Sequence, residues 1–133
     1  MINIYTDGGS RGNPGPSACA FLIMDSEIIL AFDAIYTGIN TNNFAEYSGL
    51  LLASKYIKKN IKHNSEIQIY MDSELVVNQM TGKFKINNEE LNKLKKVIDQ
   101  NLVGVKYKIS HIERSKNSHA DKLVNIVLDS IEN

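Results

Sequence analysis

Four acidic residues occupy positions from which a folded chain could bring them together. Asp7 and Asp72 each follow a short alternating apolar segment typical of a β-strand, and a tyrosine lies two residues before each. Glu46 and Asp121 each begin an apolar stripe with helical spacing. Clustered carboxylates repel one another unless cations lie between them. Mg²⁺, with Mn²⁺ as a substitute, suits such a set because hard divalent ions prefer carboxylate, water and phosphate oxygens.

The chemistry that follows is metal-dependent hydrolysis of a phosphodiester. Two divalent ions roughly 4 Å apart can activate a water and stabilise the leaving oxygen during in-line attack. One cysteine and three histidines, scattered along the chain, do not make a zinc site. Taken alone, Glu46 fits equally well a first-turn residue that faces solvent and interacts with the helix dipole. The hypothesis therefore depends on all four carboxylates.

An α/β arrangement of elements would position these residues. Alternating patterns predict strands over residues 2–7, 17–24, 27–36, 66–72 and 105–112, the first three as an antiparallel meander. Apolar stripes predict helices over residues 43–59, 74–80, 89–100 and 118–131. Asn42 or Asn43 is expected to cap the first helix, and Ser73 the second. A strand reached through a helix is normally parallel to its neighbour, so Asp7 and Asp72 are expected to converge.

The segment 8–16 is rich in glycine and proline and is expected to be a loop. Its glycines would let a bulky partner approach the backbone, and Arg11 and Asn13 would offer donors to phosphate and sugar oxygens. His63, in a polar turn, is assigned no role.

Length and composition indicate one domain, residues 1–133, with an ordinary core. Lysine plus arginine equals aspartate plus glutamate, 15 each, which argues against binding nucleic acid through bulk charge. The sequence shows no long apolar run and no basic leader, so we expect a cytoplasmic monomer that does not contact membranes.

Four motifs in order, which span nearly the whole chain, resemble those of the type 1 ribonuclease H family. They are Tyr5-Thr6-Asp7-Gly8-Gly9-Ser10 with Gly12-Asn13-Pro14-Gly15, Thr41-Asn42-Asn43-Phe44-Ala45-Glu46, Tyr70-Met71-Asp72-Ser73, and Asn117-Ser118-His119-Ala120-Asp121-Lys122-Leu123. The resemblance implies the ribonuclease H-like α/β fold, with a five-stranded mixed sheet in the order 3-2-1-4-5 flanked by helices.

The implied activity is endonucleolytic hydrolysis of the RNA strand of RNA/DNA hybrids, leaving 5′-phosphate and 3′-hydroxyl ends. The resemblance makes Asp7, Glu46, Asp72 and Asp121 the catalytic and metal-binding carboxylates. Gly12 and Asn13 would contact the RNA minor groove and 2′-hydroxyls, Asn42 and Asn43 both strands, and Thr41 a DNA phosphate.

The chain departs from many bacterial members in two places. The link at residues 81–88 is too short for their extra basic helix, so this is a short form without the basic protrusion. Residues 113–117 leave no room for their loop histidine, and Arg114 is a candidate phosphate contact instead. His111 is expected to be structural, and His119 to point away from Asp121.

The missing basic helix predicts hybrid binding that is weak and falls steeply with salt, although Lys83 and Lys85 would compensate in part. Affinities measured at about 50 mM and 200 mM salt check this expectation. A tight affinity that ignores salt would contradict it.

Two alternatives remain beside hybrid cleavage. Recognition of shape through the minor groove does not exclude additional activity on double-stranded RNA. A nucleic-acid-binding module that keeps the fold without catalysis is a different class of function, and a substitution at Asp72 would distinguish it from an enzyme.

Overall fold

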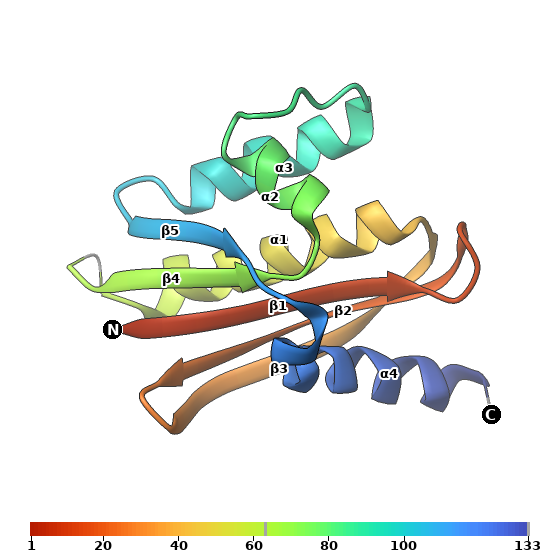
Figure 1. Ribbon diagram of the computed structural model, residues 1–133, viewed down its shortest axis with the longest axis horizontal. Coiled ribbons are helices and arrows are strands. Elements are labelled where there is room, and N and C mark those ends of the chain that lie inside the picture. The colour runs from red at the N-terminus through yellow and green to blue at the C-terminus, as the bar shows by residue number, and fades with distance from the viewer. Residues whose placement is uncertain (63, 133) are drawn as a thin grey trace.

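The strands of the chain form one mixed sheet, and helices pack against it (Figure 1). The computed structural model describes residues 1–62 and 64–132, and His63 lies outside them. The strands are β1 (Ile2–Ser10), β2 (Gly15–Asp25), β3 (Ile28–Asn40), β4 (Glu66–Met71) and β5 (Lys106–His111). The helices are α1 (Asn42–Asn60), α2 (Glu74–Met80), α3 (Glu89–Asn101), the 3-10 turn η1 (Arg114–Lys116) and α4 (Ser118–Glu132).

The strand order is β3-β2-β1-β4-β5, as the family resemblance implied. The three N-terminal strands form the expected antiparallel meander. β4 lies parallel to β1, with Ile2 opposite Ile67 and Tyr5 opposite Tyr70, and β5 lies parallel to β4. The Tyr5 and Tyr70 rings stack with centroids 5.1 Å apart. This register brings Asp7, inside β1, level with Asp72, which directly follows β4.

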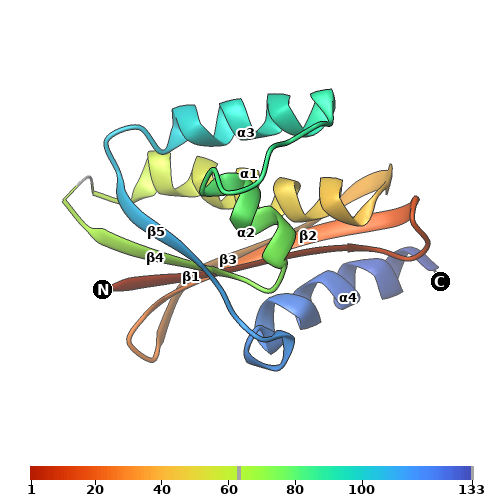
Figure 2. The same cartoon turned by 45° about the horizontal axis from the view of Figure 1, so that its top comes forward.

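Helices cover both faces of the sheet (Figure 2). α1, α2 and α3 lie on one face over the main core, which is built around Ile4, Tyr47 and Ile69. α4 lies on the other face, where Val124 and Leu128 pack against the small side chains of Ala18 and Ala20 in β2. None of the helices described combines the length and apolar character required to cross a membrane.

Strand pairing extends β1 and β3 beyond their predicted ends. Gly8, Gly9 and Ser10 belong to β1 because each pairs with a residue of β2, so the expected loop at 8–16 shrinks to residues 11–14. β3 continues to Asn40, which pairs with Gly15. Pairing with a neighbouring strand thus determines where β1 ends, even though the local sequence is rich in glycine.

Two local predictions about helix starts had different outcomes. The N-cap of α1 is Thr41, whose hydroxyl accepts from the Phe44 N–H at 3.2 Å, so the prediction of Asn42 or Asn43 was wrong. Ser73 caps α2 as predicted, by accepting from the Val76 N–H.

Gly8 brings α1 against β1. A Cβ at residue 8 would lie 2.2 Å from the backbone carbonyl of Ala45. From the helix side, a Cβ on Gly49 would lie 2.7 Å from the carbonyl oxygen of Asp7. The bulky partner that Gly8 admits is therefore the protein's own helix.

Candidate active site

Three of the four predicted carboxylates converge at one place. Asp7 lies in β1, Asp72 directly follows β4, and Glu46 lies in the first turns of α1. One carboxylate oxygen from each residue lies within 4.8 Å of the other two. The predicted convergence of Asp7 and Asp72 is confirmed. A set of three closely spaced carboxylate oxygens fits a hard divalent cation.

Glu46 lies against the sheet rather than in solvent. Its side chain is buried, and its Oε1 accepts a hydrogen bond from the Gly8 N–H at 2.6 Å. The close approach of α1 to Gly8 makes this contact available. The alternative interpretation of Glu46 as a solvent-facing residue of the first turn is wrong.

Asp121 stands apart from the tight cluster but lines the same cleft, which has a volume of about 490 Å³. Arg114 of η1 also lines this cleft and is exposed. Neither His111 nor His119 is among the residues that line the cleft. The structure thus places Arg114, and neither of these histidines, beside the carboxylates.

The predicted substrate-binding residues divide into two groups. Asn42 and Asn43 line the cleft, whereas Gly12, Asn13 and Thr41 lie outside its lining. Asn13 is nevertheless tied to the cleft, because its side-chain oxygen accepts from the Asn42 N–H at 3.0 Å. The side-chain oxygen of Asn42 in turn accepts from the Ser10 N–H at 2.8 Å. These bonds hold the β1–β2 loop against the start of α1.

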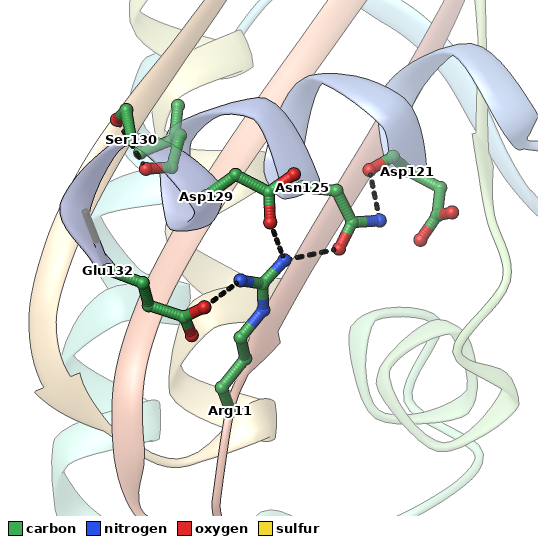
Figure 3. Close-up of polar contacts among 7 residues, drawn as sticks. Arg11, Asp121, Asn125, Asp129, Ser130 and Glu132 are labelled. Carbon is green, nitrogen blue, oxygen red and sulfur yellow. Dashed lines mark hydrogen bonds and ion pairs between the residues drawn. The ribbon is translucent and has the colours of Figure 1, made fainter.

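Arg11 forms ion pairs and a hydrogen bond with side chains of α4 (Figure 3). Its guanidinium lies 2.7 Å from carboxylate oxygens of both Asp129 and Glu132, and it donates to the Asn125 side-chain oxygen at 3.2 Å. Asn125 also donates to the backbone oxygen of Asp121 at 3.0 Å. In this structure the guanidinium of Arg11, which also lines the cleft, donates to side chains of α4.

Asn117 is a site residue to which the sequence assigned no individual role. It is buried directly before α4, and its side-chain amide donates to the backbone oxygen of Thr6 at 2.9 Å. Its own backbone oxygen accepts from the Asp121 N–H at 3.1 Å. Asn117 therefore joins the strand of Asp7 to the helix of Asp121. Its position four residues before Asp121, at a helix start, was the available signal.

The carboxylates have altered pKa values because they are buried together. Burial raises the pKa of Asp7 to about 7, with further increases from Asp72 and Asp121 that oppose the effect of hydrogen bonds with Glu46 and Gly8. Burial also raises the pKa of Glu46 well above its ordinary value, and the Asp7 charge adds to this. Burial raises the pKa of Asp72, while Asn117 and Arg114 oppose the increase. A bound cation would favour the ionised forms.

The metal-free protein is expected to lose stability as the pH rises from about 4 to about 7. Over this interval the folded state keeps a proton on Asp7 that the unfolded state, with an ordinary pKa of 3.8, has released. The free energy of unfolding therefore falls with pH, by an amount on the order of 4 kcal/mol. The measurement is the melting temperature in EDTA at several pH values.

Asp7→Asn tests this assignment, because it removes the ionisable group with little change of shape. In EDTA at a pH above 7 the variant should melt at a higher temperature than the parent, and the difference should vanish near pH 4. If Asp7→Asn melts below the parent above pH 7, the assignment is wrong.

Solved structures define the class of fold. The structure of LC11-RNase H1 in complex with an RNA/DNA hybrid has 36% sequence identity to this chain, a TM-score of 0.94, and complete coverage of both chains. RNase H1 from the halophilic archaeon Halobacterium salinarum has 34% identity and a TM-score of 0.90, with coverage of 97% of this chain and 98% of that one. The molecule therefore has the ribonuclease H-like fold.

Sequence comparison agrees. The family model described as Reverse transcriptase-like matches residues 5–127. The bifunctional protein Rv2228c of Mycobacterium tuberculosis is 37% identical over 97% of this chain, which spans 36% of that protein's length. Together with the match to LC11-RNase H1 over its full length, these relationships show that the chain belongs to the type 1 ribonuclease H family.

Proposed function

We propose that this chain hydrolyses the RNA strand of RNA/DNA hybrids, cutting internally and leaving 5′-phosphate and 3′-hydroxyl ends. The observation that carries the proposal is the convergence of Asp7, Glu46 and Asp72 in an open cleft that Asp121 also lines. Support also comes from LC11-RNase H1, a full-length structural relative solved with such a hybrid. A monomeric, cytoplasmic enzyme of one domain is the simplest form of this proposal.

The donor set fits Mg²⁺, with Mn²⁺ as a substitute, because all its ligand atoms are carboxylate oxygens. Asp7, Glu46 and Asp72 would hold the cation, and Asp121 would complete the site from α4. When bound, two such ions would activate a water for attack on phosphorus and stabilise the leaving 3′-oxygen.

Hydrogen bonds within the chain orient the carboxylates of the site. The Gly8 N–H fixes one oxygen of Glu46, and Asn117 connects the strand of Asp7 to the first turn of α4. Since these donors belong to rigid elements, the carboxylates are held before substrate arrives.

Substrate would lie across the asparagines at the start of α1. We propose that Asn42 and Asn43 contact both strands, and that Gly12 and Asn13 meet the 2′-hydroxyls that distinguish RNA from DNA. The bond from the Asn42 N–H to Asn13 supports this grouping, because it places the two segments side by side. Thr41, exposed at the N-cap of α1, would contact a DNA phosphate.

The test is cleavage of an end-labelled RNA/DNA hybrid with Mg²⁺ or Mn²⁺. Single-stranded RNA, duplex RNA and duplex DNA are the comparison substrates, and EDTA is the metal-free control. Internal cuts in the RNA of the hybrid support the proposal, and failure to cut it with either ion would refute it. Nothing in the described residues favours duplex RNA, so cutting of that substrate would show a broader specificity than the one proposed.

Arg114→Ala is expected to weaken hybrid binding about tenfold, with a smaller effect on the rate of the bound complex. The side chain is an exposed cation that lines the cleft, and a charge-assisted bond to phosphate contributes on the order of 1–2 kcal/mol. Steady-state kinetics with a hybrid substrate provide KM and kcat.

Lys116→Ala is the matched control, because Lys116 lies in the same turn and is exposed but does not line the cleft. Unaltered affinity and turnover in Arg114→Ala would exclude the phosphate contact.

A further inference from the structure

Arg11 connects two walls of the cleft. Residues 7–11 line one wall, and α4 lines another with Asp121, Asn125 and two apolar side chains. The guanidinium of Arg11 reaches α4 from the first wall, as Figure 3 shows. Its acceptors there are side-chain oxygens of Asn125, Asp129 and Glu132. These positions follow one another at helical spacing and lie on one face of α4. A single side chain therefore ties that face to the end of β1.

α4 depends on this connection because few of its side chains are buried. Three of its 15 residues are buried, and the last of them along the helix is Leu128. Val124 and Leu128 pack on the small side chains of Ala18 and Ala20 rather than in the main core. Two of the three ion pairs within the described part of the chain belong to Arg11. Both go to the segment of α4 beyond its last buried residue, so Arg11 fixes the part of the helix that apolar contacts hold least.

The placement of α4 matters because this helix carries Asp121, the carboxylate that stands apart from the other three. On one side of Asp121, Asn117 joins the start of the helix to β1. On the other side, Asn125 accepts from Arg11 and donates to the backbone oxygen of Asp121, one turn earlier. The position of Asp121 is therefore determined from both directions along α4.

Arg11 also begins the β1–β2 loop, which is proposed to meet the RNA strand. Its N–H donates to the Pro16 carbonyl at 2.8 Å, and this bond closes the loop. Asn13 of the same loop accepts from the Asn42 N–H. One residue thus connects the loop proposed to contact substrate with the helix of Asp121.

We propose that Arg11 is a positioning residue for hybrid cleavage. Through α4 it fixes Asp121 relative to the other three carboxylates and aligns this helix with the loop that contacts RNA. The inference rests on the proposed function. The alternative role, a direct contact with phosphate, is disfavoured because Asp129 and Glu132 already occupy the guanidinium and would repel a phosphate.

The experiment compares Arg11→Ala with the double variant Asp129→Ala/Glu132→Ala, which removes the carboxylate partners instead. Assays at about 0.15 M salt screen exposed charges beyond roughly 8 Å. Both variants should lower kcat on an RNA/DNA hybrid about tenfold, because a displaced Asp121 misplaces the reacting groups. KM should stay within about twofold, since the lost contacts are not contacts with substrate.

The triple variant, which combines these substitutions, should be no slower than either, because residues that act as one unit are not additive. Lys59→Ala is the matched control, since it removes an exposed cation at the end of α1, outside the cleft. It should cut at the parental rate. A phosphate contact predicts the opposite pattern, in which Arg11→Ala raises KM at constant kcat and the double variant, with its guanidinium released, lowers KM. That pattern, or additive losses in the triple variant, would overturn the proposal.

Two measurements without substrate test the same inference independently of cleavage. Calorimetric titration with Mg²⁺ alone should show an affinity weaker by about threefold to tenfold in Arg11→Ala and in the double variant, and unchanged in Lys59→Ala. Hydrogen exchange of the α4 amides should be faster in the same two variants. Their melting temperatures should stay within roughly 3 °C of the parent, because exposed ion pairs contribute little to global stability.

Unchanged Mg²⁺ affinity and unchanged α4 exchange in both variants would overturn the proposal. If Arg11→Ala fails to fold, the double variant decides by the same criteria. A parent that cuts no hybrid refutes the proposed function instead, and the Mg²⁺ and exchange measurements then decide whether Arg11 positions α4.

Discussion

Asp72→Asn is expected to lower the rate of hybrid cleavage on the order of 10³-fold while leaving fold and hybrid affinity nearly unchanged. The substitution replaces a carboxylate oxygen of the cluster by an amide NH₂ group, which cannot bind a cation. Loss of a metal-binding carboxylate removes electrostatic stabilisation of the transition state, the largest contribution to catalysis of this kind. Single-turnover cleavage and a binding isotherm on the same hybrid provide the two quantities.

Asp25→Asn is the matched control, because it makes the same chemical change at the exposed end of β2, outside the cleft. It should cut at the parental rate. If Asp72→Asn cuts as fast as the parent, the assignment of this cluster is wrong. If the parent binds hybrid but does not cut it with Mg²⁺ or Mn²⁺, the protein is the binding module considered from the sequence.

Gly8→Ala is expected to reduce the free energy of unfolding by about 3 kcal/mol or more, equivalent to a melting temperature lower by roughly 10 °C. The new Cβ would lie 2.2 Å from the carbonyl carbon and oxygen of Ala45 and 2.5 Å from the Glu46 nitrogen. All three are backbone atoms of α1, so no side chain can rotate away. The helix would have to move, and the Gly8 bond to Glu46 with it. Thermal and denaturant unfolding measure the effect.

Gly9→Ala provides the comparison at the next residue. A Cβ there meets the Val124 Cγ1 at 3.9 Å, which is an ordinary contact. Its effect on stability should stay within about 1 kcal/mol, since the added methyl group clashes with nothing. An equal loss of free energy of unfolding in the two alanine variants would show that β1 needs glycine at both positions for a reason other than the close approach of α1.

The acidic cluster could be predicted because its signals are local. The alternation in residues 2–7 and 66–72 places Asp7 and Asp72 on equivalent faces of two strands, and helical crossovers between parallel strands align their ends. The apolar stripe that begins at Glu46 placed this carboxylate against the core, where it is buried. The spacing of apolar residues and the position of each carboxylate within its strand or helix were enough to predict where these three residues lie.

The remaining details depend on contacts between distant segments. The strand character of Gly8 to Ser10 comes from β2, and no local pattern contains it. The ion pairs of Arg11 could not be predicted, because its carboxylate partners, Asp129 and Glu132, lie more than a hundred positions away. The role of Thr41 as the cap required the exact start of α1, and element ends are the least defined feature of a sequence pattern.

The origin of the carboxylates in four separate elements has a consequence for biosynthesis. β1, β2, β3 and α1 are consecutive and make mostly short-range contacts, so this half of the fold can form early in translation. The pairing of β4 with β1 must wait until a much longer loop has closed, and Asp121 arrives with α4. A growing chain therefore holds Asp7 and Glu46 before it holds Asp72 or Asp121, so the set of four carboxylates that the proposed function uses is complete only after α4 has docked.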